Sequence, residues 1–270
     1  MPAVSVPIRA EILDRLRAIE AEEDVRLIYA CESGSRAWGF PSADSDYDVR
    51  FLYVRPPDWY LSVNVERRPD VLRRPISVSA SGAVLDLAGW DLRKALVLLR
   101  KSNASPQEWL RSPIVYRADG TVVPDLQTVA AAAFRPLAVY HHYRSMAKRT
   151  YHDHLAGPQV HTKKYFYVLR PLLAVRWIEA ALGPVPVEFS ALLDAVSPPG
   201  SFRPTVDALI EAKRSGSEGD AAAPIPVLQT FIQAELARLE HASPPPPTDP
   251  ISMDRLNTAF RTTVRSVWAE

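Results

Sequence analysis

The sequence has few of the residues that support covalent cross-links or membrane insertion. Cys31 is the single cysteine among 270 residues, which excludes an intramolecular disulfide and a zinc site built from cysteines. No apolar run is long enough to span a bilayer. The first residues also lack the basic and apolar regions of a signal peptide. We therefore expect a cytoplasmic protein without a membrane partner.

Neither sign of charge dominates the composition. The chain has 32 basic and 31 acidic residues, so it has no global attraction for nucleic acid, and any such affinity requires a local basic patch. Apolar residues make up 47% of the chain, which is enough for a sizeable core. A length of 270 residues fits one large domain or two modest ones.

The first part of the chain mixes helical and strand patterns. Apolar residues at helical spacing predict a helix over 8–23. Short apolar runs predict strands at 25–33 and 46–54, and two more within 76–88 that are joined by a turn. Asp91 is a suitable N-cap for a helix that follows it.

The second part has helical patterns and no convincing strand. The predicted helices cover residues 125–134, 136–155, 160–181, 188–196, 203–214, 226–241 and 251–267. Strands followed by helices indicate an α+β protein. We expect a domain with a small mixed sheet and helices over 1–118, followed by a helical domain over 119–270.

Two carboxylates stand close together at the start of the strand predicted over 46–54. Asp46 and Asp48 are two residues apart, so on a strand their side chains point to the same face. Their mutual repulsion is costly without a cation, and oxygen ligands favour Mg²⁺ or Mn²⁺. A second ion completes the two-metal arrangement used in nucleotidyl transfer. The alternative is that both are solvated turn residues, but the apolar run after Asp48 argues for a buried strand.

A third carboxylate is expected on a neighbouring strand. Asp86 lies between apolar residues, where an unpartnered charge is unfavourable. Asp91 competes for this role, although its position before a helix is already explained by capping. Asp86 as a charge on an edge strand is the alternative that remains open.

Gly34 and Ser35 follow the strand predicted over 25–33. A glycine lets backbone N–H groups approach an anion closely, and the serine hydroxyl adds a donor. Arg36 adds a positive charge next to them. An ordinary turn at the end of a strand is the alternative, but the spacing to Asp46 and Asp48 favours a phosphate-binding loop.

Together these residues resemble the polymerase-beta-type nucleotidyltransferases. That family has Gly-Ser, about ten residues, Asp-x-Asp on a strand, and one Asp on a later strand, matching Gly34, Ser35, Asp46, Asp48 and Asp86. The resemblance implies that Gly-Ser holds the triphosphate and that the three acids hold two metal ions and are catalytic.

A narrower resemblance spans both halves of the chain. The segments ESGSRAWGFPSADSDYDVRFLYV, LDLAGWDLRKALVLLRKSNASPQEWLRSPIVY and KKYFYVLRPLLAVRWIE are similar to the RNA-ligase-associated nucleotidyltransferases of RNA repair. This resemblance implies template-independent addition of nucleotides to RNA ends.

The helix predicted over 160–181 has a basic and aromatic stripe. Lys163, Tyr167 and Arg170 are spaced to share one face, and Lys164 lies on an adjacent face. Such a stripe can bind a triphosphate and stack a base. A solvated face is the alternative. Lys148 and Arg149 on the preceding helix extend a basic patch toward nucleic acid.

We therefore expect a Mg²⁺-dependent or Mn²⁺-dependent enzyme that transfers a nucleoside monophosphate from a nucleoside triphosphate to the 3′ end of RNA. Other acceptors, a small molecule resembling an aminoglycoside or a protein side chain, use the same chemistry. A catalytically inactive scaffold that binds nucleotide or RNA is the third alternative, against which the presence of all three acids argues.

Overall fold

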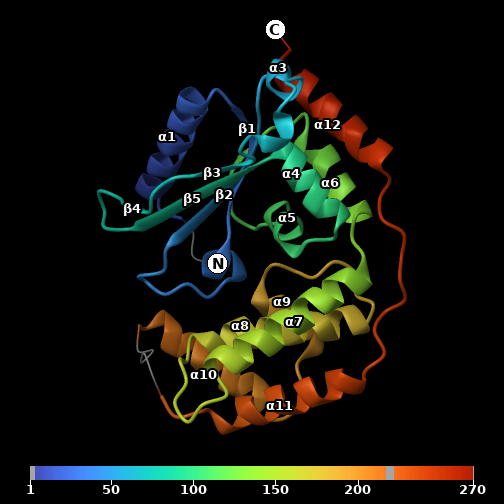
Figure 1. Ribbon diagram of the computed structural model, residues 1–270. Helices are drawn as coiled ribbons and strands as arrows, with labels where there is room; N and C mark the ends of the chain where they lie inside the picture. The colour runs from blue at the N-terminus through green and yellow to red at the C-terminus, as the bar shows by residue number, and fades with distance from the viewer. Residues whose placement is uncertain (1–3, 217–221, 270) are drawn as a thin grey trace. The chain divides into compact units, whose positions relative to one another are not determined.

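The computed structural model describes residues 4–216 and 222–269 (Figure 1) and has the expected mixed α+β fold. The helices are α1 (Val6–Glu23), α2 (Gly34–Trp38), α3 (Pro57–Tyr60), the 3-10 helix η1 (Val65–Arg67), α4 (Leu92–Arg100), α5 (Ala104–Trp109), α6 (Val123–Ala132), α7 (Pro136–His154), α8 (Lys164–Glu179), α9 (Phe189–Val196), α10 (Phe202–Arg214), α11 (Pro226–His241) and α12 (Met253–Val267). The strands are β1 (Arg26–Glu32), β2 (Tyr47–Val54), β3 (Val71–Arg73), β4 (Ser77–Val78), β5 (Val84–Asp91) and β6 (Val115–Ala118). No helix in the described ranges has the length and apolar character needed to cross a bilayer.

Six strands form one mixed sheet. Five of them run in the order β3-β5-β2-β1-β6, and β4 pairs with β5. Strands β2 and β5 are parallel, and the other pairs are antiparallel. The parallel register places Asp48 directly opposite Asp86.

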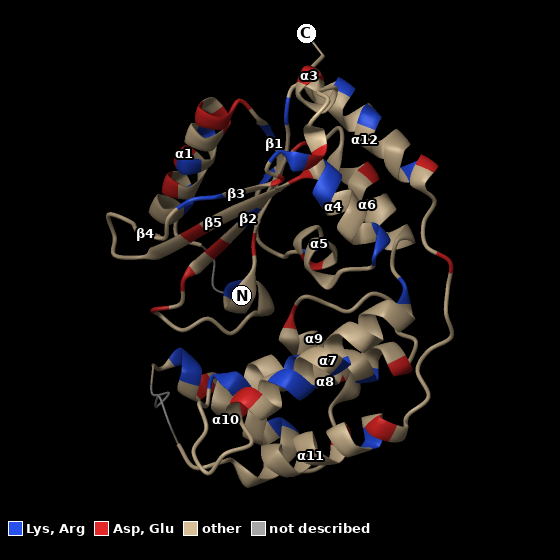
Figure 2. Ribbon diagram, viewed as in Figure 1, with Lys and Arg blue, Asp and Glu red and all other residues tan. Residues whose placement is uncertain are grey.

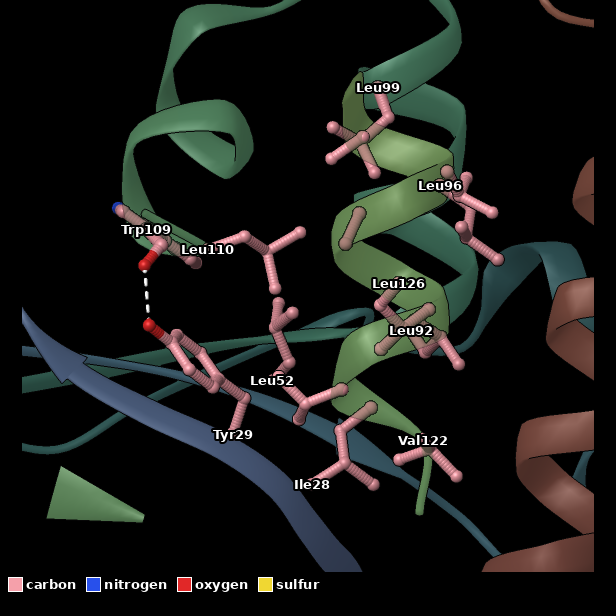
Figure 3. Close-up of a cluster of buried hydrophobic side chains, with 14 of the residues drawn as sticks. Ile28, Tyr29, Leu52, Leu92, Leu96, Leu99, Trp109, Leu110, Val122 and Leu126 are labelled. Carbon is pink, nitrogen blue, oxygen red and sulfur yellow. Dashed lines mark hydrogen bonds between the residues drawn. The ribbon is translucent and has the colours of Figure 1, made fainter. Parts of the chain in front are cut away.

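Apolar side chains cover both faces of this sheet. On one face, Ile12 and Leu16 of α1 pack with Phe51 of β2 and Leu85 of β5. On the other face, the core contains Leu52 of β2 and residues of α4, α5, α6 and α12. Figure 3 shows this second core, in which the Tyr29 hydroxyl donates to the Trp109 carbonyl oxygen over 2.8 Å. The sheet is therefore the middle of three layers.

The chain forms two compact units whose limits differ from the boundary expected after residue 118. The sheet unit consists of Met1–Ala37, Ser45–Phe134 and Pro250–Glu270, and the helical unit of Trp38–Asp44 and Arg135–Asp249. Helices α6 and α12 belong to the sheet unit because Leu126 and Leu256 are buried in its core. Helical periodicity shows that a helix has an apolar face but not which core that face joins.

The segment Trp38–Asp44 belongs to the helical unit, although in sequence it lies between Gly34 and Asp46. Phe40 is buried and stacks on Phe166 of α8 with ring centroids 4.4 Å apart. Its ring also meets Phe189 of α9 edge-on at 5.4 Å. The Arg214 guanidinium donates to the Gly39 carbonyl oxygen over 3.1 Å. These contacts anchor the segment in the helical unit.

Candidate functional site

The structure brings Asp48 and Asp86 together on adjacent strands. Residues alternate between the two faces of a strand, so both side chains lie on the sheet face that contains Leu52. The acidic positions of β2 and β5 are red in Figure 2. The Arg50 guanidinium lies between the two carboxylates, with Nη2 2.8 Å from Asp48 Oδ1 and 2.7 Å from Asp86 Oδ2. Asp91, the competitor of Asp86, is instead the N-cap of α4 and accepts from the Arg93 backbone N–H.

Asp46 lies immediately before β2, at the end of a loop that Arg36 fixes. The Arg36 guanidinium donates to the carbonyl oxygens of Asp46 and Ser45, over 3.1 and 2.6 Å. It also lies over the Tyr47 ring, 3.7 Å from the centroid. In this arrangement Arg36 positions the start of β2.

The charges around Asp48 affect its pKa. Burial raises the pKa of Asp48 above its ordinary value, and the nearby charges of Asp86 and Asp46 raise it further. The Arg50 guanidinium opposes this shift. A cation beside Asp48 therefore stabilises its ionised form.

Gly34 packs directly against the Asp48 carboxylate. Its φ is +60°, and a Cβ on Gly34 would lie 2.2 Å from Asp48 Oδ2. The backbone N–H of Ser33 also donates to the Asp48 carbonyl oxygen over 2.9 Å. Gly34 and Ser35 begin α2, a short helix of five residues. The glycine is required here by the conformation of the backbone and by the carboxylate beside it.

Glu32 is a site residue that we did not predict from the sequence. It is fully buried at the end of β1, and its Oε1 accepts from the Asp48 backbone N–H over 2.7 Å. The Tyr116 hydroxyl of β6 donates to its other carboxylate oxygen. Burial raises the pKa of Glu32 to about 7, against the opposing effect of these two hydrogen bonds. An acid at the end of an apolar strand, directly before Ser-Gly-Ser, was the available signal.

The raised pKa of Glu32 predicts a pH-dependent stability. A carboxyl group with a pKa raised from 4.5 to about 7 stabilises the fold below pH 4.5 and loses that contribution as the pH rises through 7. Relative to Glu32→Gln, the wild type should lose about 2–4 kcal/mol of unfolding free energy between pH 4.5 and 8. Tyr116→Phe should be more destabilising at pH 8 than at pH 5, because it removes a donor to the ionised form. Urea unfolding of the metal-free proteins measures both effects, and parallel pH profiles for wild type and Glu32→Gln would contradict the assignment.

The donor set of the site fits a hard divalent cation. Carboxylate oxygens from two adjacent strands face one another, which is the chemistry that Mg²⁺ and Mn²⁺ prefer. In the described parts of the chain no group of three or more His, Cys, Asp or Glu side chains is already arranged around a metal position. Arg50 Nη2 bridges Asp48 and Asp86 instead. The two acids thus already bind a shared cation.

The predicted basic and aromatic residues of α8 have different surroundings within the helical unit. Lys163 is exposed at the N-cap, and Tyr167 is 44% exposed with Lys164 Nζ 5.4 Å from its ring centroid. Arg170 is buried and donates to the carbonyl oxygens of Pro186 and Val187 over 3.3 and 3.4 Å. The stripe predicted from spacing alone therefore has an exposed part and a buried part.

Trp38 joins these residues, a contact that sequence spacing did not suggest. Its ring meets Tyr167 edge-on at 5.5 Å, and the Arg170 guanidinium lies 4.8 Å from its centroid. We call Trp38, Lys163, Lys164 and Tyr167 the aromatic–basic cluster. Arg170 fixes the position of Trp38 in this cluster.

Comparison with known proteins identifies the family of this chain. The profile of the RNA repair pathway DNA polymerase beta family matches residues 8–262. The chain belongs to this family. The chain is 42% identical over 264 residues to the uncharacterized protein YcgL from Bacillus subtilis strain 168. The alignment covers 97% of this chain and 99% of YcgL.

A solved structure of a nucleotidyltransferase-like protein from Exiguobacterium sibiricum 255-15 is a more remote match for this family member. It is 14% identical, with a TM-score of 0.31, over 93% of this chain and 75% of the other. The family membership rests on the profile match and on the similarity to YcgL.

Proposed function

We propose that this protein is a divalent-metal-dependent nucleotidyltransferase that adds a nucleoside monophosphate to the 3′ end of RNA. The observation that carries this function is the register of β2 and β5, which places Asp48 opposite Asp86 with Asp46 just before β2. Gly34 lies against Asp48, so the loop proposed to bind phosphate adjoins the acids. Membership of an RNA repair family supports RNA as the acceptor.

The residues of the sheet unit have distinct roles in this reaction. Asp46, Asp48 and Asp86 hold the metal ions, and Gly34 and Ser35 bind the β- and γ-phosphates. Asp86 orients the attacking hydroxyl and accepts its proton, while that oxygen bonds to the α-phosphorus and the bond to the pyrophosphate oxygen breaks. When bound, the metal ions would neutralise the negative charge on the α-phosphate and on the leaving pyrophosphate. Glu32 accepts from the backbone N–H of Asp48 in β2, and Arg36 donates to the carbonyl oxygens of Ser45 and Asp46 just before β2, so both position the strand.

The aromatic–basic cluster is the second recognition surface that we propose. Tyr167 and Trp38 are partly exposed aromatic rings, and base–aromatic stacking contributes about 1–3 kcal/mol per base. Lys163 and Lys164 lie at the start of α8, where their charges favour phosphate. In the helical unit this cluster combines an apolar surface for a base with cations for a phosphate.

The acceptor is tested by supplying all candidates together. The protein is incubated with labelled ATP, Mg²⁺ or Mn²⁺ and a pool of RNA oligonucleotides. RNA extended at the 3′ end supports the proposed function, and label on the protein indicates a side-chain acceptor. Label on an added aminoglycoside indicates a small-molecule acceptor, and the absence of turnover with any nucleotide favours an inactive scaffold.

RNA binding through local charge should depend strongly on salt. Each lysine that contacts a phosphate contributes roughly 0.7 to the slope of log affinity against log salt for a single strand. Replacing Lys163 and Lys164 with Ala should therefore lower the slope by roughly 1.4. The measurement is a titration of RNA at several salt concentrations.

The matched control replaces Arg261 and Arg265 with Ala. Both are exposed on α12 of the sheet unit, and the pair removes the same charge as the lysine variant. An equal change of slope in both double variants would show only the effect of net charge. A slope near zero in the wild type would exclude RNA as an electrostatically bound acceptor.

A further inference from the structure

We infer that Arg50 is a built-in cation that competes with the divalent metal for Asp48 and Asp86. The inference rests on the proposed function, because it concerns the metal that these acids hold. Arg50 lies two residues after Asp48 on β2, so both side chains point to the same face of the sheet. A single nitrogen, Nη2, contacts one oxygen of each carboxylate, at 2.8 and 2.7 Å.

The guanidinium is fixed from its other side by the backbone. Arg50 Nη1 donates to the carbonyl oxygen of Asp86 over 2.8 Å and to that of Val49 over 3.2 Å. The Arg50 side chain is 18% exposed, and those of Asp48 and Asp86 are 32% and 31% exposed. Arg50 is therefore anchored beside acids that solvent and ions can reach.

A carboxylate oxygen that accepts a hydrogen bond from the Arg50 guanidinium binds a metal ion more weakly. Asp48 and Asp86 would hold a divalent cation through carboxylate oxygens, and Arg50 Nη2 already contacts one oxygen of each, so Arg50 and the cation would compete for them. Asp46, Asp48 and Asp86 have three negative charges, and Arg50 reduces the formal charge of the group to −2. Arg50 thus stabilises the acids in the absence of metal and weakens the binding of the first metal ion.

The test is the affinity of the purified full-length chain for Mn²⁺ alone, measured by calorimetry. Arg50→Gln removes the bridging cation, so it should bind Mn²⁺ roughly tenfold more tightly than the wild type and melt at a lower temperature without metal. Arg50→Lys keeps the charge but cannot both bridge the carboxylates and contact the two carbonyls, so its affinity should lie between these values. Arg74→Gln is the matched control, since Arg74 pairs with Glu22 and Glu23 of α1. Its Mn²⁺ affinity should stay within about twofold of the wild type.

The sign of the change decides the role of Arg50. Unchanged or weaker Mn²⁺ binding by Arg50→Gln, with normal binding by the wild type, would overturn competition and make Arg50 a residue that merely positions the acids. If Arg50→Gln does not fold, the test uses Arg50→Lys, which should also bind Mn²⁺ more tightly than the wild type. A wild type that binds no Mn²⁺ at millimolar concentration would instead overturn the metal dependence of the proposed function.

Discussion

Replacing Asp48 or Asp86 with Asn should lower nucleotidyl transfer at least roughly a thousandfold while the protein stays folded. Each substitution keeps the size of the side chain but removes a negative charge from the position that is proposed to hold the metal. Preorganised charge at the reacting phosphate commonly contributes two to three orders of magnitude in rate, and loss of a direct metal ligand should reach the upper end.

The effect on stability should be small because two changes oppose each other. Loss of the Asp48 charge removes the free-energy cost of burying an ionised carboxylate, which is the cause of its raised pKa. It also removes an attraction to Arg50. A partly exposed ion pair contributes about 1 kcal/mol or less, so the melting temperature of the metal-free protein should shift by only a few degrees.

The measurement pairs turnover of labelled ATP with the melting temperature of each metal-free variant. Asp58→Asn serves as the control, because Asp58 is exposed at the start of α3 in the same unit and should leave turnover unchanged. An Asp48→Asn enzyme that remains active would remove Asp48 from the metal site. Inactivity that accompanies unfolding would give no support to the assignment.

Local patterns in the sequence were sufficient to predict β2 and β5, the strands at which the three acids lie, but not α2, which Gly34 and Ser35 begin. Apolar spacing predicted α1 and the helices from α6 to α12, and short apolar runs predicted β1, β2 and the β4–β5 pair. Asp86 was expected beside the other acids because a charge within an apolar strand needs a partner, and β5 indeed pairs with β2.

Contacts that depend on pairing between distant segments could not be predicted. Arg50 reaches Asp86 only because β2 and β5 are parallel neighbours, and about thirty residues of chain separate these strands. Glu32 depends in the same way on Tyr116 of β6. The contacts of Trp38 with Tyr167 and Arg170 come from the folding of one short segment into the helical unit. Periodicity contains no information on such partners.

Gly34→Ala should combine a moderate loss of stability with a large loss of transfer. The φ of +60° at Gly34 is unfavourable for alanine by about 1–2 kcal/mol. The new Cβ would also lie 2.2 Å from Asp48 Oδ2, which is far inside contact distance. Asp48 must therefore rotate away, and its contact with Arg50 and its alignment with Asp86 should be lost. We expect transfer to fall roughly a hundredfold or more, because small displacements of a catalytic group have effects of this size.

Gly82→Ala separates backbone strain from the clash with Asp48. Gly82 lies in the turn between β4 and β5 with a φ of +82°, and a Cβ there would meet nothing within 4 Å. This variant should have a similar cost in backbone conformation, about 1 kcal/mol, with transfer and Mn²⁺ affinity unchanged. Urea unfolding, turnover and Mn²⁺ calorimetry on both variants compare the two effects directly. If Gly34→Ala retained wild-type turnover and lost no more stability than Gly82→Ala, the packing of Gly34 against Asp48 would have no part in catalysis, and the Gly-Ser segment would be only a turn.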